Sequence, residues 1–384
     1  MVLKFGPDNP PIVIDNGTGL LKVGYSGEME PRAVVPMILG RPKHMKVIAD
    51  RNSDECFVGD IAGGKRGALT LSYPMMNGIV QNWDDLETIW QHVFTNELRV
   101  LPENHPMLLT ETPLNPKVNR EKMAEIMFEQ FHAPAVYISI QAILSLYASG
   151  RTTGLVLDCG EGATHLVPVF DAYVIPTAIH RRNLAGREVT NYLKHLLTER
   201  GYKLITTCEH EIARDVKENL CYVAMDYGKE LQFSQGDKKM YEMTYRLPDG
   251  QLLNIGSERF RAPELMFDPK LAGYEMNGIH TATNETILAC GMDVRKSFWS
   301  NIILTGGGTM FRGFPERLRK ELHRLAPKGA TVKVMASPER KYSVWIGGAV
   351  LASLIWRRDD LSQKSNCRRL MSTEGFTKDR IIDQ

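Results

Sequence analysis

Two short segments each place an aspartate before a run containing glycines, a pattern that could hold a phosphate group. The first runs from Asp15 to Gly19 with Lys22 just beyond it, and the second runs from Asp158 to Gly162. Glycines let backbone N–H groups approach an anion closely, and the lysine would neutralise its charge. The segments therefore predict phosphate-binding hairpins, although plain tight turns explain the same residues.

The two aspartates extend this hypothesis to a metal ion. Carboxylates from both turns, Asp15 and Asp158, would approach one divalent cation, while the glycine amides hold a polyphosphate that bridges the turns. Mg²⁺ suits such a site and would be held partly through water, because it loses its hydration shell reluctantly. The pair of segments predicts a polyphosphate site with its cation.

Three further features are weaker candidates. Residues 306–308 are glycines that follow the apolar residues 302–304, so a flat base or ribose could lie against bare backbone there. An ordinary strand-to-helix turn is the simpler explanation of these glycines. Gln141, in an apolar helical stretch, and His165, just beyond the second hairpin, could orient a water molecule in line with a terminal phosphate. Each is otherwise a hydrogen-bonded structural residue.

The elements that must position these residues follow an α/β pattern, because short apolar runs rich in branched residues alternate with helical patterns. Residues 11–14 and 20–25 predict a β-hairpin turned by Asn16-Gly17, and residues 153–157 and 164–169 repeat it, which suggests two related domains. Helical spacing predicts helices over 119–131 with Asn119 as N-cap, over 190–200 ending at Gly201, and over 209–224. From Arg357 onward the sequence no longer shows this alternation of strand and helix patterns.

Composition narrows the class of protein. The chain has 384 residues, of which 43% are hydrophobic, and its 47 Lys and Arg against 45 Asp and Glu give a net charge of +2. Nonspecific nucleic-acid binding is therefore not expected. The start of the chain lacks the apolar core of a signal peptide, and no apolar run is long enough to span a membrane. The six scattered cysteines suggest neither a zinc site nor a disulfide framework.

Taken in order, these segments resemble the actin family across residues 11–354. The match is supported by residues 40–44, 108–111, 114–116, 144–154 and 340–348. The resemblance implies the two-lobed α/β ATPase fold shared with hexokinase and heat-shock chaperones, in which duplicated β-sheet domains flank a nucleotide cleft. It implies a first lobe over 1–145 with an insertion subdomain at about 36–74, a second lobe over 146–342 with a small subdomain at about 186–262, and a return to the first lobe over 343–384 that ends in a divergent tail.

The resemblance also assigns residues to ATP or ADP and to Mg²⁺ or Ca²⁺. The residues expected at the phosphates are Gly17, Thr18, Gly19, Leu20 and Lys22 from the first lobe, and Gly160, Glu161, Gly162 and Ala163 from the second. The nucleoside would meet Gly186, Arg214, Lys217, Glu218, Gly306, Gly307, Met310, Phe311 and Lys341. Asp15, Gln141 and Asp158 would surround the hydrated cation. Gln141 and His165 would position the attacking water, which implies slow ATP hydrolysis.

Several positions depart from the actin pattern. Glu161 stands where actins carry an aspartate, and Asn77 stands where they carry the histidine that is usually methylated. Residues 45–53, which align with the loop that inserts into the next filament subunit, lack the expected glycines. The acidic N-terminal cluster is missing, so ordinary myosin binding is not expected. After Leu354 the resemblance ends.

Two functions therefore remain open. The chain could form filaments or short polymers with copies of itself, or it could be a non-polymerising subunit of a dynactin-like, chromatin-remodelling or axonemal complex that uses ATP to stabilise its fold. A small-molecule kinase is disfavoured, because no residue presents itself as a general base beside an acceptor. Contacts with actin-binding proteins would be altered, and neither nucleic acid nor membrane is an expected partner. The expected location is the cytoplasmic cytoskeleton, with the nucleus and axoneme left open.

Overall fold

The computed structural model describes residues 9–43, 56–65, 67–202, 207–236, 241–247, 250, 252–356 and 375–376. The chain divides into two compact units. The first unit is discontinuous and comprises Met1–Thr152 and Lys341–Gln384, whereas the second comprises Thr153–Arg340. The sequence placed these changes of domain at 145/146 and 342/343. The loop at 45–53 and the tail beyond Trp356, except for residues 375–376, lie outside the described residues.

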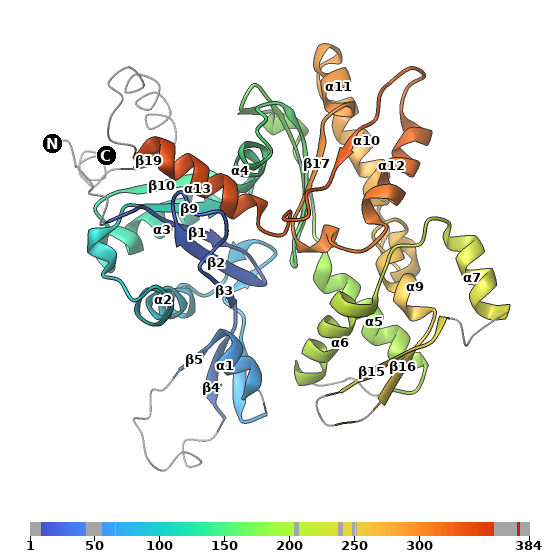
Figure 1. Ribbon diagram of the computed structural model, residues 1–384, viewed down its shortest axis with the longest axis horizontal. Coiled ribbons are helices and arrows are strands. Elements are labelled where there is room, and N and C mark those ends of the chain that lie inside the picture. Colours follow the sequence, from blue (N-terminus) through green and yellow to red (C-terminus); the bar gives the residue numbers. More distant parts are fainter. Residues whose placement is uncertain are drawn as a thin grey trace. The chain divides into compact units, whose positions relative to one another are not determined.

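The first unit is built on a six-stranded sheet with the order β19-β10-β9-β1-β2-β3 (Figure 1). Its strands are β1 Ile12–Asn16, β2 Leu20–Tyr25, β3 Ala33–Pro36, β9 Met107–Glu111, β10 Val136–Ile140 and β19 Gly375–Phe376. β1, β9 and β10 run parallel, while β2, β3 and β19 are antiparallel to their neighbours. The parallel strands are buried almost throughout, as expected for strands covered on both faces.

Helices cover both faces of this sheet. On one face lie α2 Trp83–His92, its π-helical continuation Val93–Leu98, and α3 Lys117–Glu129, whose core side chains include Trp90 and Phe128. On the other face lie α4 Gln141–Ala148 and α13 Ser343–Ile355, which pack around Val13 and Trp345. α4 and α13 approach so closely that a Cβ at Gly347 would clash with the carbonyl oxygen of Leu144.

The predicted start of α3 is wrong. The helix begins at Lys117, directly after Pro116, and no side chain caps it. Proline fixes its φ angle near the helical value, which favours a helix that begins directly after it. Asn119 instead donates a hydrogen bond to Asn115 Oδ1 at 3.3 Å.

Two small sheets extend the first unit. β4 Leu39–Pro42, β5 Phe57–Val58 and β6 Leu69–Ser72 form one sheet beside α1 Gly59–Gly64, and Arg41 and Ser72 both bond to the buried Asp85 at the start of α2. β7 Met75–Met76 and β8 Ile79–Val80 form a hairpin. Its turn residues, Asn77 and Gly78, have φ angles of 52° and 78°. Asn-Gly is the sequence that most favours such a turn.

The second unit has a sheet of similar design, with the order β13-β12-β11-β17-β18 and β14 beside β12. Its strands are β11 Gly154–Cys159, β12 Thr164–Phe170, β13 Tyr173–Val174, β14 His180–Arg182, β17 Ile302–Thr305 and β18 Val334–Met335. β11 is antiparallel to β12 and parallel to β17. The arrangement repeats that of β1, β2 and β9, so the repeated hairpin found in the sequence corresponds to repeated structure.

One apolar core joins this sheet to the surrounding helices. These are α5 Gly186–Glu199, α6 Thr207–Leu220, α7 Tyr227–Gly236, α9 Glu258–Glu264, α10 Ile279–Ala289, α11 Met292–Trp299 and α12 Phe314–Leu325, with a hairpin of β15 Met243–Arg246 and β16 Leu252–Ile255. α5 ends before Gly201 as predicted, with φ +101° at that glycine. It starts earlier than predicted, because Glu188 accepts from the Ala185 N–H and fixes the first turn. α6 ends at Leu220, before the predicted Ala224.

A buried ion pair joins α9 and α12 and also holds the segment that follows α6. Arg317 on α12 binds both carboxylate oxygens of Glu264 on α9, at 2.9 and 3.1 Å, and donates to the carbonyl oxygen of Ala224. It also pairs with Glu321 one turn along α12 and lies over the ring of Phe267. The cysteines at 159, 221 and 290 are buried, and none of them forms a disulfide with another described residue. No helix in the described part of the chain is both long enough and apolar enough to cross a membrane.

Candidate functional site

The first predicted phosphate segment is the turn between β1 and β2. Asn16 is still paired with Leu21 in the strand ladder, so it belongs to β1 and not to the turn, where the sequence placed it. The turn consists of Gly17, Thr18 and Gly19. A Cβ at Gly17 would lie 2.5 Å from the carbonyl oxygen of Leu20, so this position needs glycine. Thr18 Oγ1 accepts a hydrogen bond from the Gly78 N–H at 2.8 Å, which fixes the turn against the β7–β8 hairpin.

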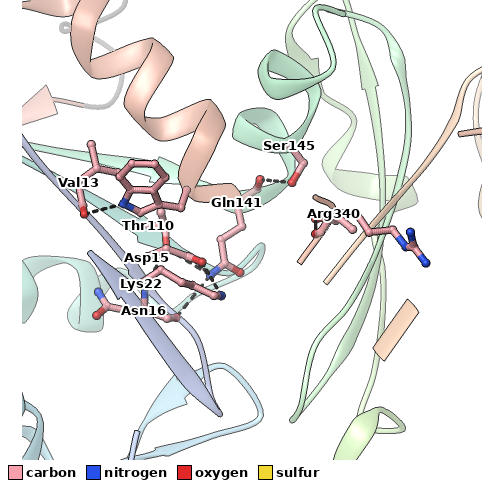
Figure 2. Close-up of polar contacts among 10 residues, drawn as sticks. Val13, Asp15, Asn16, Lys22, Thr110, Gln141, Ser145 and Arg340 are labelled. Atoms are coloured by element: carbon pink, nitrogen blue, oxygen red, sulfur yellow. Dashed lines mark hydrogen bonds and ion pairs between the residues drawn. The ribbon is translucent and has the colours of Figure 1, made fainter. Parts of the chain in front are cut away.

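Asp15 is the centre of the polar network in the first unit, and its side chain is only 1% exposed. Lys22 Nζ pairs with Oδ2 at 2.8 Å, Thr110 Oγ1 donates to Oδ1 at 2.7 Å, and Gln141 Nε2 donates to Oδ1 at 3.2 Å (Figure 2). Asp15, Thr110 and Gln141 come from the carboxyl ends of the parallel strands β1 and β9 and from the residue after β10. Ligands of open α/β sheets bind at this edge.

Gln141 is positioned by its place in the chain. It is the first residue of α4 and follows β10 directly, so its side chain lies at the same sheet edge as Asp15. Its Nε2 also lies 3.3 Å from Thr110 Oγ1 and 3.4 Å from the Asn16 carbonyl oxygen, and Ser145 Oγ donates to its backbone oxygen (Figure 2). With the amide nitrogen held in this way, the side-chain oxygen of Gln141 is left to accept from a water molecule.

Trp90 and Thr110 belong to this network but were not assigned from the sequence. Trp90 Nε1 donates to Asn16 Oδ1 at 3.0 Å, and because the indole is only a donor it fixes the orientation of the Asn16 amide. Asn16 Nδ2 has no partner among the described residues and lies at a cavity of about 10 Å³ lined also by Glu111 and Asn115, which has room for one water molecule. The sequence signal for Thr110 was its place in residues 108–111, one of the segments that carry the resemblance.

The second phosphate segment is the turn between β11 and β12. Asp158 is paired in the ladders with His165 on β12 and with Thr305 on β17. The turn is closed by the Gly160 N–H, which donates to the Ala163 oxygen at 3.1 Å. The start of α5 packs on it, because the Gly186 N–H donates to the Gly160 oxygen at 3.1 Å.

The third glycine segment lies directly against the second. A Cβ at Gly308 would lie 2.5 Å from Cys159 Sγ, and one at Gly306, whose φ is +84°, would clash with the Cys159 oxygen. Arg340, which the sequence did not single out as a site residue, holds this segment through its guanidinium to Thr309 and through its backbone oxygen to the Gly306 N–H. The structure therefore brings residues 158–163 and 306–309 together within the second unit.

Some of the predicted nucleoside residues contact the second phosphate segment and the start of α5, and others contact different parts of the chain. Lys217 on α6 is buried and joins the site, since its Nζ lies 3.0 Å from the Gly186 oxygen and 3.5 Å from Glu161 Oε2. Arg214 pairs with Glu211 on the same helix, and Glu218 is half exposed. Phe311 packs into the core, Met310 is exposed, and Lys341 belongs to the first unit.

His165 is held as a neutral imidazole. It is 2% exposed, and burial, with a smaller contribution from the Arg181 cation, lowers its pKa to about 4. Its Nε2 has no hydrogen-bond partner among the described residues. A neutral ring with one unsatisfied nitrogen can orient a water molecule but is not a proton donor at neutral pH. The neighbouring Cys159 thiol is inert, because burial raises its pKa to about 12.

The first unit fits a hydrated cation better than a bare one. Each oxygen of Asp15 already accepts hydrogen bonds, yet a carboxylate has about four lone-pair sites and can still accept from metal-bound water. Within the described ranges, no three His, Cys, Asp or Glu side chains gather as direct metal ligands.

The sequence and these elements agree with a comparison to known families. A protein-family model described as Actin matches residues 6–357. The match spans most of the chain and confirms the predicted mixed α/β fold of this family. The chain belongs to the actin family.

Proposed function

We propose that this actin-family protein binds ATP together with Mg²⁺ or Ca²⁺ and hydrolyses it slowly. The observation that supports this most strongly is the buried Asp15, held by Lys22, Thr110 and Gln141 at the carboxyl ends of parallel strands. A buried carboxylate–lysine pair adds little net stability, because the cost of removing both charges from water offsets their attraction, so stability alone does not account for this arrangement.

Each candidate site residue of the first unit has a defined role in this proposal. The amides of residues 17–20 bind phosphate oxygens, and Lys22 neutralises their charge. Asp15 accepts hydrogen bonds from the water shell of the cation, which itself would stabilise charge on the phosphates. Gln141 holds the attacking water through its side-chain oxygen.

The second unit supplies matching residues. Asp158 provides the second carboxylate, and the amides of residues 161–163 bind phosphate, since the Gly160 N–H already closes the turn. Lys217 and the bare backbone at Gly306 and Gly307 contact the nucleoside. His165 orients water without protonating the leaving phosphate, because its ring is neutral. Positioning without strong acid or base catalysis accords with slow turnover.

We further propose that the protein assembles with copies of itself as a cytoplasmic cytoskeletal polymer. The alternative, a non-polymerising subunit that uses ATP to stabilise its fold, is supported by the departures at residues 45–53 and after Leu354, where actins contact their neighbours. Altered binding of actin-binding proteins and loss of ordinary myosin binding belong to either proposal.

Calorimetric titration with MgATP tests nucleotide binding. Asp15→Asn should weaken binding about tenfold or more, because it removes the charge that attracts the hydrated cation. Glu103→Gln is the matched control, since Glu103 is an exposed carboxylate in a turn outside the site. Equal affinities for the two variants, or no binding by the wild type, would refute the proposal.

Sedimentation and light scattering across a concentration series, with phosphate release followed in the same sample, test assembly. Pelleting above a critical concentration with coupled phosphate release supports the polymer. Protein that binds ATP but remains monomeric at every concentration excludes the polymer and favours the subunit of a larger complex.

A further inference from the structure

The chain contains three Asn-Gly pairs, at Asn16-Gly17, Asn77-Gly78 and Asn277-Gly278. Such pairs are chemically labile, because a glycine nitrogen that loses its proton can attack the side-chain amide carbon of the preceding asparagine. The new C–N bond closes a succinimide ring and ammonia leaves. Water then opens the ring at either carbonyl and gives aspartate or isoaspartate. Glycine favours the attack since it adds no side chain and little conformational resistance.

The Asn77-Gly78 pair has its reactive nitrogen covered by one specific hydroxyl. The Gly78 N–H donates to Thr18 Oγ1 at 2.8 Å, while Thr112 Oγ1 donates to the Gly78 oxygen. Asn77 is partly exposed, so water can reach its side chain. An N–H that is held by an acceptor retains its proton, and the positive φ angles of the turn fix both residues. The hydrogen bond from Gly78 to Thr18 therefore opposes the first step of the reaction.

The other two pairs provide references within the same molecule. Asn16 is 4% exposed, is paired in a strand ladder, and has its amide oxygen held by Trp90. Asn277 is exposed, and its side chain donates to Glu285 at 2.7 Å. The Gly278 N–H has no acceptor in the described part of the chain. Asn277-Gly278 is remote from Thr18 in the chain, whereas Asn16-Gly17 directly precedes it.

We propose that Asn77 is a deamidation site whose reaction is suppressed by the Thr18 hydroxyl. The modification replaces a neutral amide with a carboxylate at a hairpin that contacts the β1–β2 turn. Because like charges repel, the deamidated protein binds a polyphosphate more weakly. This last consequence rests on the proposed function, whereas the suppression of the reaction by Thr18 does not.

Peptide mapping by mass spectrometry after incubation in mildly alkaline buffer tests the proposal. Thr18→Val removes the acceptor and keeps the shape, while Thr18→Ser keeps the hydroxyl. Relative to Asn277 in the same sample, deamidation of Asn77 should rise about fivefold in Thr18→Val, the population effect of one neutral hydrogen bond. It should stay close to the wild-type value in Thr18→Ser. Equal relative rates in all three proteins would overturn the proposal.

A second measurement tests the proposal if Thr18→Val proves to be unfolded. Deamidation of Asn16 would rise together with that of Asn77 if Thr18→Val unfolds the first unit. Hydrogen exchange in the wild-type protein then decides, because the Gly78 amide should exchange more slowly than the Gly278 amide. Exchange at the same rate would overturn the proposal.

The functional consequence is measured separately, by comparing MgATP affinity of Asn77→Asp and Asn277→Asp. Weaker binding by Asn77→Asp alone supports the effect of the added charge, and equal affinities refute it. Absence of ATP binding by the wild-type protein would refute the proposed function but would leave the deamidation rates, and the role of Thr18 in them, unaffected.

Discussion

At the scale of single residues, burial decides what His165 can do. The same side chain on the surface would titrate near neutral pH, but here removal from water disfavours the cation and lowers the pKa to about 4. The ring therefore stays neutral across the physiological range. In the hydrolysis that we propose, its contribution would be orientation of water, as would that of Gln141, whose amide nitrogen is held by Asp15 and Thr110.

His165→Gln should reduce the loss in free energy of unfolding that occurs as the pH falls below 6.5. Between pH 6.5 and about 4 the unfolded chain binds a proton at His165 that the folded chain does not bind, so stability falls as pH decreases. By pH 5 this costs the wild type about 2 kcal/mol relative to pH 7.5. Denaturant unfolding at both pH values measures the difference, and an equal acid loss in the variant would contradict the assignment.

Single residues also show where sequence reasoning reaches its limit. Asp15, Lys22 and Gln141 were found because their types and neighbours suggested chemistry. Trp90 was not, because its bond to Asn16 spans 74 positions and leaves no local pattern. The orientation of a buried amide depends on such long-range partners.

At the scale of elements, close packing of α4 and α13 depends on one missing side chain. A Cβ at Gly347 would clash with the backbone oxygen of Leu144, and backbone cannot move aside as a flexible side chain can. Gly347→Ala should therefore destabilise the protein by about 3 kcal/mol. Gly63→Ala in α1, where no heavy atom lies near the added methyl, should be neutral or slightly stabilising. Thermal unfolding of both variants checks this, and equal effects would contradict the packing argument.

The buried Arg317 should matter far more than an exposed arginine on the same helix. Arg317→Met leaves the carboxylate of Glu264 buried without its partner, which costs about 3 to 5 kcal/mol. Arg324, whose side chain is 63% exposed, pairs with the same Glu321, and Arg324→Met should cost less than about 0.5 kcal/mol. Comparable losses in denaturant unfolding would show that burial does not set the strength of this pair.

Elements were predictable where a local signal exists. The two hairpins were found because alternating apolar residues and glycine turns lie next to each other in the chain, although Asn16 proved to be strand and not turn. The starts of α3 and α5 were missed because neither helix has a polar residue at its N-cap position, which is Pro116 in α3 and Ala185 in α5. α6 ends before Ala224 because the chain leaves the helix to pair Tyr222 with Arg312, a long-range contact.

At the scale of the whole molecule, a ligand that binds only the folded protein raises its stability by mass action. MgATP at about 100 times its dissociation constant should add about 2.7 kcal/mol. Asp15→Asn in the first unit and Asp158→Asn in the second should each reduce this gain, if both units supply a carboxylate. Calorimetric scans with and without MgATP measure it, and loss of the gain in only one variant would assign the nucleotide to one unit alone.

The duplication was the part of the overall organisation that the sequence revealed, because Asp15 and Asp158 sit in matching motifs. Which helices cover each sheet could not be read in the same way. α13, for example, is apolar along most of its length, so its sequence does not show which face meets the sheet. Its position is set by packing against Val13 and Leu144, which lie far away in the sequence.

The packing of α13 against Val13 and Leu144 has a consequence for folding while the chain is being synthesised. The second unit is complete once Arg340 has been synthesised, but the first unit lacks Trp345 until the ribosome has passed it. At ordinary translation rates, about 10 to 40 s separate Leu144 from the helix that covers it. Throughout that interval the nascent chain carries an apolar sheet face around Val13 and Leu108 that α4 covers only in part, because α13 has not yet been made. The early half of this protein must therefore be kept from aggregating until its final quarter emerges.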